Sequence, residues 1–127
     1  MYQKGDVIWH KSFPFKNGGQ PQDKFLILLN SPQKEDPFLF ALTTSQSKNK
    51  PQTLSCHSNS GYFVIERGKE KVFPKQTWIK LFDIQAFNSA ELLKRSLELK
   101  QIIHKESLTQ QTINEIINCC FMDNANF

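Results

Sequence analysis

The chain has 127 residues, of which 39% are hydrophobic and 22% are charged. This length and composition exclude a largely disordered chain and predict one globular domain spanning residues 1–127. Sixteen Lys and Arg against twelve Asp and Glu give a formal net charge of +4. That small excess is compatible with a polyanionic partner such as RNA, but it does not require one.

The sequence predicts a cytoplasmic protein without membrane contact. Its longest uncharged apolar run, residues 25–29, is far shorter than the ~20 residues that span a bilayer. The N-terminal residues lack the apolar core of a signal peptide. The cysteines are Cys56 and the adjacent pair Cys119 and Cys120, and none has metal-ligand spacing. We therefore expect reduced thiols, with neither a disulfide nor a metal site.

The first two thirds of the chain predict short strands separated by turns rich in Gly, Pro, Asn and Ser. Residues 24–30 (KFLILLN) are almost wholly apolar, as in a strand buried on both faces, and are the best core candidate. Pro51 and residues 55–60 predict surface loops. Such strands predict a mainly β, α+β fold in which a small sheet curls into a barrel. The other predicted strands cover residues 6–10, 37–45, 61–65 and 77–82.

The C-terminal third predicts helices. Residues 107–110 form a capping box that opens a terminal amphipathic helix, which we expect to lie on the sheet. A second helix is predicted to begin at Asn88, but residues 97–104 fit helical spacing and strand alternation equally well. Residues 122–127 carry no pattern and are expected to fray. The apolar stripe of the terminal helix comprises Ile113, Ile116, Ile117 and Cys120.

Several short motifs follow one another in a recognisable order. They are residues 4–9 (KGDVIW), the glycine loop at 17–19, Lys24 directly before an apolar strand, and residues 41–45 (ALTTS). A Pro-flanked loop, a strand near Trp78 and a C-terminal amphipathic helix come next. Across nearly the whole chain this order resembles the PemK/MazF-like toxins of bacterial toxin-antitoxin systems. Each motif alone is common, so the order carries the resemblance.

The resemblance implies an SH3-like β-barrel, usually a homodimer, that cleaves single-stranded RNA at short sequence motifs without a metal or other cofactor. It also implies a small antitoxin partner whose acidic, disordered segment occupies the RNA groove. In the family the 2'-hydroxyl of the RNA attacks, assisted by an Arg before the second strand and a Ser or Thr ending the third. Those positions fall on Lys24 and on Thr43 or Thr44, so Lys replaces Arg here.

That replacement changes the chemistry available at the site. Attack by the 2'-oxygen places negative charge on the phosphate, which a fixed cation and hydroxyl donors stabilise. Lys24 supplies a point charge, but it lacks the bidentate fork of Arg, and it is a poor base unless desolvated. The protein is therefore a slower nuclease, or another residue transfers the proton, or activity is lost. His57 is the candidate for that transfer, and its alternative is a solvated loop residue.

The remaining candidates are side chains that could contact RNA, and each has a structural alternative. Lys24 could simply keep its ammonium in water while its stem covers apolar surface. Thr43 and Thr44 could be ordinary strand formers, and Phe13 and Phe15 are expected in the core. The candidate RNA-binding residues are Lys11, Lys16, Gln20, Lys48 and Lys50 for the backbone, and Tyr62 for base stacking.

The main alternative function is a catalytically degenerate barrel that binds RNA or a protein partner. The Lys at the usual Arg position favours it. An enzyme built around His57 with Ser58 or Ser60 is a third hypothesis, and no nucleophile elbow supports it. His10 is expected to be structural and His104 to be a surface group.

Overall fold

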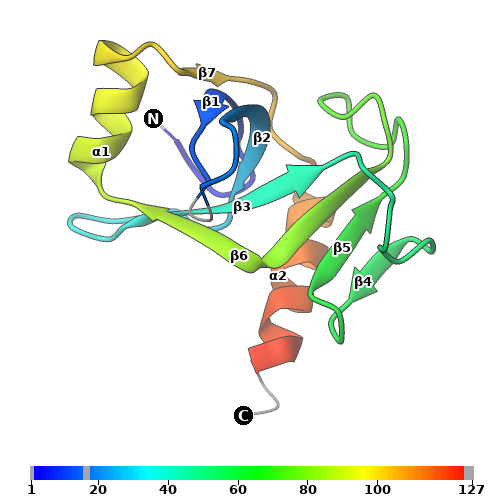
Figure 1. Cartoon of the computed structure of the whole chain (residues 1–127). Coiled ribbons are helices and arrows are strands. Elements are labelled where there is room, and N and C mark those ends of the chain that lie inside the picture. The colour runs from blue at the N-terminus through cyan, green and yellow to red at the C-terminus, as the bar shows by residue number, and fades with distance from the viewer. Residues whose placement is uncertain (1, 16–17, 125–127) are drawn as a thin grey trace.

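The computed structural model describes residues 2–15 and 18–124, and within them seven strands form one open antiparallel sheet (Figure 1). The strand order is β4-β5-β6-β3-β2-β1-β7, so β4 and β7 are the two edges. The helices are α1 (Ser89–Leu93), which continues into the π-helical turn η1 (Lys94–Glu98), and α2 (Gln110–Asn124). The mainly β, α+β prediction is confirmed. The strands are β1 (Val7–Phe13), β2 (Gln22–Leu28), β3 (Phe38–Thr44), β4 (Ser55–His57), β5 (Tyr62–Ile65), β6 (Thr77–Phe87) and β7 (Ile102–His104).

Alternation along β2 divides the core between the two faces of the sheet. Ile27 packs in a cluster that includes Ile113 and Ile116 of α2, which lies behind the sheet in Figure 1. Leu26 packs on the other face with Leu92 of α1 and other apolar residues. Both β2 residues are 0% exposed, and burial of each side chain contributes about 1.5–3 kcal/mol. The run at 24–30 therefore supplies both clusters, as its apolar pattern predicts.

The capping box is not used as predicted. The Ser107 hydroxyl donates to Oδ1 of Asp6 at 2.6 Å, because folding brings this buried carboxylate from the other end of the chain. The first turn of α2 is held instead by Glu70, which accepts from the amide of Thr109 at 2.9 Å and from the hydroxyl of Thr112 at 2.7 Å. The helix consequently begins at Gln110 rather than directly after Ser107.

The expectation of reduced thiols is also wrong, because Cys56 and Cys119 form a disulfide between residues 63 positions apart. The predicted loop at 55–60 is partly a strand, since Ser55–His57 form β4 and pair with β5. A pairing of this kind depends on where β4 and α2 meet in space, and cysteine spacing carries no such information.

The ambiguous segment 97–104 contains both structures: the π-helical turn ends at Glu98 and β7 begins at Ile102. The helix predicted from Asn88 is confirmed, with the Asn88 side chain accepting from the amide of Glu91 at 2.8 Å. The predicted fraying of 122–127 falls partly outside the residues that the structure describes, and α2 continues to Asn124. In the described part of the chain, none of the helices combines the length and apolar character needed to cross a membrane.

Candidate functional site

Lys24 and Thr44 lie on the same face of the sheet. Leu26 of β2 pairs directly with Leu42 of β3, and alternate residues of a strand share a face. Lys24 precedes Leu26 by two positions, and Thr44 follows Leu42 by two. Two residues that are far apart in the chain are therefore neighbours at the ends of adjacent strands.

Thr43 points to the opposite face and has a structural partner. Its hydroxyl donates to the carbonyl oxygen of Phe25 at 2.8 Å, which ties β3 to β2. Thr44 instead uses its Oγ1 as an acceptor for the amide of Gln46 at 3.2 Å. Accepting that bond does not consume the hydroxyl proton, which remains able to reach another oxygen. Of the two threonines, Thr44 is the better candidate for substrate contact.

Lys24, Thr43 and Thr44 all line one cleft of about 280 Å³. Trp9 and Phe25 form an aromatic wall of this cleft, with ring centroids 4.6 Å apart. The cleft lies at the strand ends, where Lys24 and Thr44 line it from one face of the sheet and Thr43, with Trp9 and Phe25, lines it from the other. The cleft combines polar groups at one rim with an apolar wall, as small-molecule and nucleotide sites often do.

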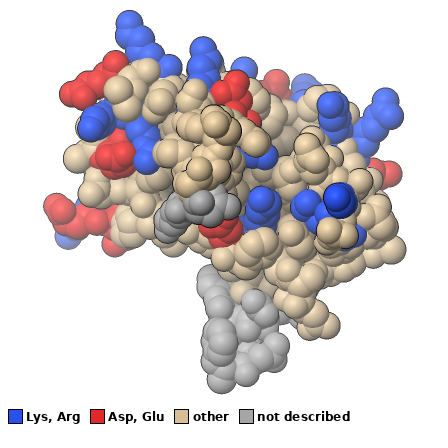
Figure 2. All heavy atoms as spheres, in the orientation of Figure 1, with Lys and Arg blue, Asp and Glu red and all other residues tan. Residues whose placement is uncertain are grey.

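Lys24 is one of three lysines whose charges interact. Burial lowers the pKa of Lys24, and the neighbouring ammonium groups of Lys80 and Lys50 lower it further. Lys80 pairs with both Leu42 and Tyr62, which places it on the same face as Lys24. We call Lys24, Lys50 and Lys80 the lysine cluster. Figure 2 shows Lys and Arg side chains spread over one side of the molecule, with Asp and Glu among them. An anion bound at the lysine cluster would relieve the mutual repulsion of its ammonium groups.

An aromatic pair, half-buried Tyr62 and exposed Phe82, adjoins the lysine cluster. Tyr62 and Phe82 have ring centroids 5.3 Å apart and nearly perpendicular planes, and Phe82 is 62% exposed. The sequence predicts Tyr62 and Lys50 as contacts but does not predict Lys80 or Phe82. A signal for Lys80 is present, because a charged residue inside the apolar run 77–82 indicates a face of the strand that is open to solvent. The exposure of Phe82 has no counterpart in the sequence pattern.

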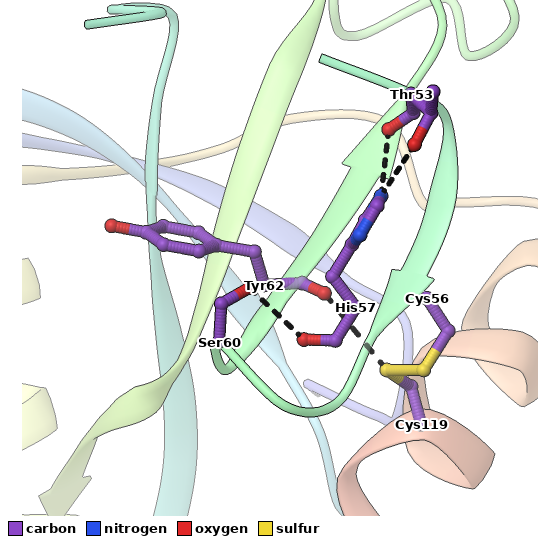
Figure 3. The surroundings of a disulfide bond; sticks show 6 residues. All are labelled: Thr53, Cys56, His57, Ser60, Tyr62 and Cys119. Atoms are coloured by element: carbon purple, nitrogen blue, oxygen red, sulfur yellow. Dashed lines mark hydrogen bonds between the residues drawn. A yellow bond between two sulfur atoms is a disulfide. The ribbon is translucent and has the colours of Figure 1, made fainter. Parts of the chain in front are cut away.

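His57 is held away from the cleft. It pairs with Tyr62 in the β4–β5 register, but its imidazole turns toward Thr53. Nε2 lies 2.8 Å from the carbonyl oxygen and 3.2 Å from the hydroxyl of Thr53 (Figure 3). His57 is not one of the described residues that line the cleft of Lys24. This arrangement favours its alternative as a residue that organises the loop.

The other candidates for RNA contact are spread over the surface. Lys11, Gln20 and Lys48 are exposed, and Lys50 is half-buried. Within the described chain, the cleft lining includes none of these four residues. Lys16 lies outside the residues that the structure describes. The structure therefore brings only Lys50 of this group near Lys24, through the lysine cluster.

His10 is a buried connector between β1 and η1. Its Nδ1 lies 2.8 Å from the carbonyl oxygen of Lys11, and its Nε2 lies 3.0 Å from Nη1 of Arg95. A carbonyl oxygen accepts and a guanidinium donates, so the proton sits on Nδ1 and the ring is neutral. Burial lowers the pKa of His10, with the positive charge of Arg95 acting in the same direction. These contacts match the structural role expected for this residue.

Comparison with known proteins assigns no family to the chain, because no family model and no curated protein matches it. Within residues 2–15 and 18–124, no group of three or more His, Cys, Asp or Glu is placed to hold a metal ion. The cleft and the lysine cluster are therefore the features of the structure from which a function can be inferred.

Proposed function

We propose that the protein is an endoribonuclease toxin of a toxin-antitoxin system, which cleaves single-stranded RNA sequence-selectively and without a metal. The observation that carries this proposal is the convergence of Lys24 and Thr44, from two different strands, on one face and in one cleft. An SH3-like barrel built from the strands of the sheet belongs to the same proposal, as does a cytoplasmic homodimer restrained by an acidic antitoxin.

The cleft offers a cation and a hydroxyl that can stabilise charge in this reaction. The ribose 2'-hydroxyl gives up its proton to solvent as its oxygen attacks the adjacent phosphorus, and the bond to the 5'-oxygen breaks as that oxygen takes up a proton, which leaves a 2',3'-cyclic phosphate. Negative charge grows on the non-bridging oxygens, where the Lys24 ammonium and the Thr44 hydroxyl would stabilise it.

The face of the sheet that carries Lys24 favours a single-stranded polyanion. Lys50 and Lys80 would bind phosphates that flank the scissile one. Tyr62 and the exposed Phe82 would stack bases, which requires bases that are not already paired in a duplex. Charge and exposed aromatic surface therefore occur together on one face of the sheet.

The proposal is tested by incubating the purified protein with a varied library of single-stranded RNA in EDTA. We expect cleavage at a limited set of sequences, with cyclic phosphate at the new 3' ends. Overexpression should halt growth, and co-expression of an acidic antitoxin should restore it. An intact library together with normal growth would contradict the nuclease proposal.

A second function, an RNA-binding or protein-binding module without catalysis, is favoured by one observation. Lys24 stands where the PemK/MazF-like toxins, which the sequence resembles, have an arginine that assists cleavage. The lysine cluster and the aromatic pair could bind RNA without cleaving it. Lys24→Arg separates the two functions. A slow nuclease should gain rate from the bidentate guanidinium, whereas a binding module should stay inactive.

A further inference from the structure

A cavity of about 480 Å³ lies where α1 and η1 follow the end of β6 (Figure 1). Among the described residues, it shares no lining side chain with the cleft that contains Lys24. Its volume is within the range of sites that bind small molecules and cofactors. We call it the arginine pocket, and it is lined by residues 13–15 and 84–87 together with Glu91 and Arg95.

The arginine pocket lies on the same face of the sheet as Lys24. Lys24 of β2 pairs directly with His10 of β1, so these two side chains share a face. The imidazole of His10 in turn accepts a hydrogen bond from Nη1 of Arg95 at 3.0 Å. An RNA strand bound at Lys24 would therefore find the arginine pocket beside it on one continuous face.

Aromatic rings form the apolar part of the arginine pocket. The rings of Phe13 and Phe15 have centroids 5.5 Å apart, and Phe15 is only half-buried. The guanidinium carbon of Arg95 lies 4.3 Å from the centroid of the Phe87 ring, a cation–π contact that holds the guanidinium in place. Aromatic and guanidinium planes are the surfaces on which proteins stack unpaired bases.

Arg95 and Glu91 each keep one polar atom for a ligand. Nε of Arg95 donates to Oε1 of Glu91 at 2.8 Å and Nη1 donates to His10, whereas Nη2 has no hydrogen bond to a described residue. Oε2 of Glu91 is likewise without a partner in the described part of the chain. The bond from Arg95 lowers the pKa of Glu91, so the carboxylate stays ionised and accepts hydrogen bonds.

Gln85 adds a second acceptor from the wall of the pocket. Its side chain is 7% exposed, and its Nε2 donates to Oδ1 of Asp83 at 2.7 Å, which fixes the orientation of the carboxamide. Its Oε1 has no partner among the described residues. Every buried side-chain nitrogen and oxygen of those residues does have a partner, so Oε1 must be accessible. An almost buried side chain with one acceptor open to a cavity is typical of a ligand site.

We propose that the arginine pocket binds one unpaired guanine base of the RNA and thereby sets the sequence preference of the proposed nuclease. The unused groups are one donor, Nη2 of Arg95, and two acceptors, Oε2 of Glu91 and Oε1 of Gln85. The Watson–Crick edge of guanine is their complement, with the acceptor O6 and the donors N1–H and N2–H. On the same edge adenine, cytosine and uracil each offer a single donor group, which leaves one buried acceptor without a bond. The inference rests on the proposed function for the RNA ligand, but it does not require cleavage.

The first test measures the affinity for 2'-O-methyl oligonucleotides, which cannot undergo attack by a 2'-hydroxyl. Each is a uridine tract with guanine, adenine, cytosine, uracil or hypoxanthine at one central position. By fluorescence anisotropy at constant salt, we expect the guanine strand to bind about tenfold more tightly than the adenine, cytosine and uracil strands, as for one bidentate base contact. Hypoxanthine lacks the N2 amino group and should bind more weakly than guanine. Equal affinity for all strands, or no binding, would overturn the guanine site.

The second test assigns the preference to the arginine pocket. Glu91→Gln keeps the shape of the side chain and an acceptor for Arg95, but it removes the carboxylate. We expect it to bind the guanine strand about tenfold more weakly while its affinity for the uracil strand stays near that of the wild type. Glu98→Gln makes the same change of charge at an exposed acid at the end of η1, outside the pocket, and should keep the preference. A guanine preference that survives Glu91→Gln would overturn the assignment.

Nuclear magnetic resonance locates the site without an RNA strand. Titration with guanosine 5'-monophosphate should shift the amide signals of residues 13, 15 and 84–87, whereas adenosine 5'-monophosphate should not. Shifts confined to other residues would overturn the pocket.

The outcomes separate this inference from the proposed function. A guanine preference that depends on Glu91, in a protein that cleaves no RNA, would support the arginine pocket and contradict the nuclease. Cleavage of RNA at sites that contain no guanine would support the nuclease and overturn the pocket.

Discussion

Thr43 donates its hydroxyl proton to the carbonyl oxygen of Phe25 at 2.8 Å, and this bond distinguishes it from its neighbour Thr44. Thr43 lies on the face of the sheet opposite Lys24, where it joins β3 to β2. Thr44 lies on the Lys24 face with its hydroxyl proton uncommitted by its bond to Gln46. Two consecutive threonines are thus assigned different tasks by strand alternation.

The two threonines should therefore respond differently to mutation. Thr44→Ala removes a donor to the developing charge and should lower the cleavage rate about 100-fold, with little change in melting temperature. Thr43→Ala removes a hydrogen bond and should cost about 1 kcal/mol of stability while leaving the rate near that of the wild type. Initial rates on one RNA and thermal unfolding check both expectations. A large loss of cleavage rate in Thr43→Ala with a normal rate in Thr44→Ala would contradict the assignment of Thr44 as the substrate contact.

His10 makes stability depend on pH. Burial lowers its pKa from 6.5, so below about pH 6.5 the unfolded chain binds a proton that the folded protein resists. The contribution of neutral His10 is fully present above the unfolded pKa and is lost as pH falls toward the lowered folded value. The free energy of unfolding, measured at a series of pH values from about 7.5 to about 5.5, should fall by up to about 1.4 kcal/mol per pH unit.

The variant His10→Gln should flatten that pH dependence, even though it lowers stability at every pH by disturbing the bonds to Lys11 and Arg95. His57→Ala is the control and should keep the wild-type dependence. An unchanged slope in His10→Gln would assign the acid sensitivity to another group.

Glu70 should be the most important single acceptor at the start of α2. Its carboxylate is 3% exposed and receives the amide and hydroxyl of Thr109 and the hydroxyl of Thr112. Glu70→Ala leaves these donors without a charged acceptor and should cost about 3 kcal/mol, measured by urea unfolding. The exposed Glu66, on the same segment, is the matched control, and Glu66→Ala should change stability by less than about 0.5 kcal/mol. Similar losses for both variants would contradict the capping role.

Phe82 should contribute to RNA binding and little to folding, because its ring is 62% exposed. Phe82→Ala should weaken binding of a single-stranded oligonucleotide about tenfold, as expected for loss of one stacked base. Leu97→Ala removes another exposed apolar side chain, 68% exposed on η1, and should leave affinity unchanged. Fluorescence anisotropy at constant salt measures both, and equal affinity of Phe82→Ala and wild type would exclude a stacking role.

The parts of the fold that local pattern determines could be predicted from the sequence. The apolar run at 24–30 identifies the central strand β2, and the stripe containing Ile113 and Ile116 identifies the buried face of α2. Both follow from side-chain periodicity over a few residues. The predicted strand at 77–82 stops short of Phe87, because the added residues of β6 are more polar than a typical strand core.

The parts that depend on long-range contacts could not be predicted in the same way. Ser107 has the right spacing to cap α2, yet the buried carboxylate of Asp6 takes its hydroxyl. The Cys56–Cys119 disulfide likewise requires that β4 meet α2. Competition between acceptors and proximity in space are set by tertiary packing, which no short window of sequence contains.

The candidate site was also only partly predictable from the sequence. Lys24, Thr43 and Thr44 are named from the order of motifs, and the structure adds that they line one cleft. Only the strand register separates the two threonines by face. Lys80 enters the site because β6 pairs with β3, a neighbour relationship that sequence order does not give.

The most direct test of the central claim compares the cleavage rate of wild type, Lys24→Ala, Lys24→Arg and the exposed-lysine control Lys48→Ala in EDTA. We expect a loss of at least about 100-fold in Lys24→Ala, a rate above wild type in Lys24→Arg, and no change in Lys48→Ala. Cleavage by Lys24→Ala at the wild-type rate would contradict the claim that the Lys24 ammonium acts on the scissile phosphate.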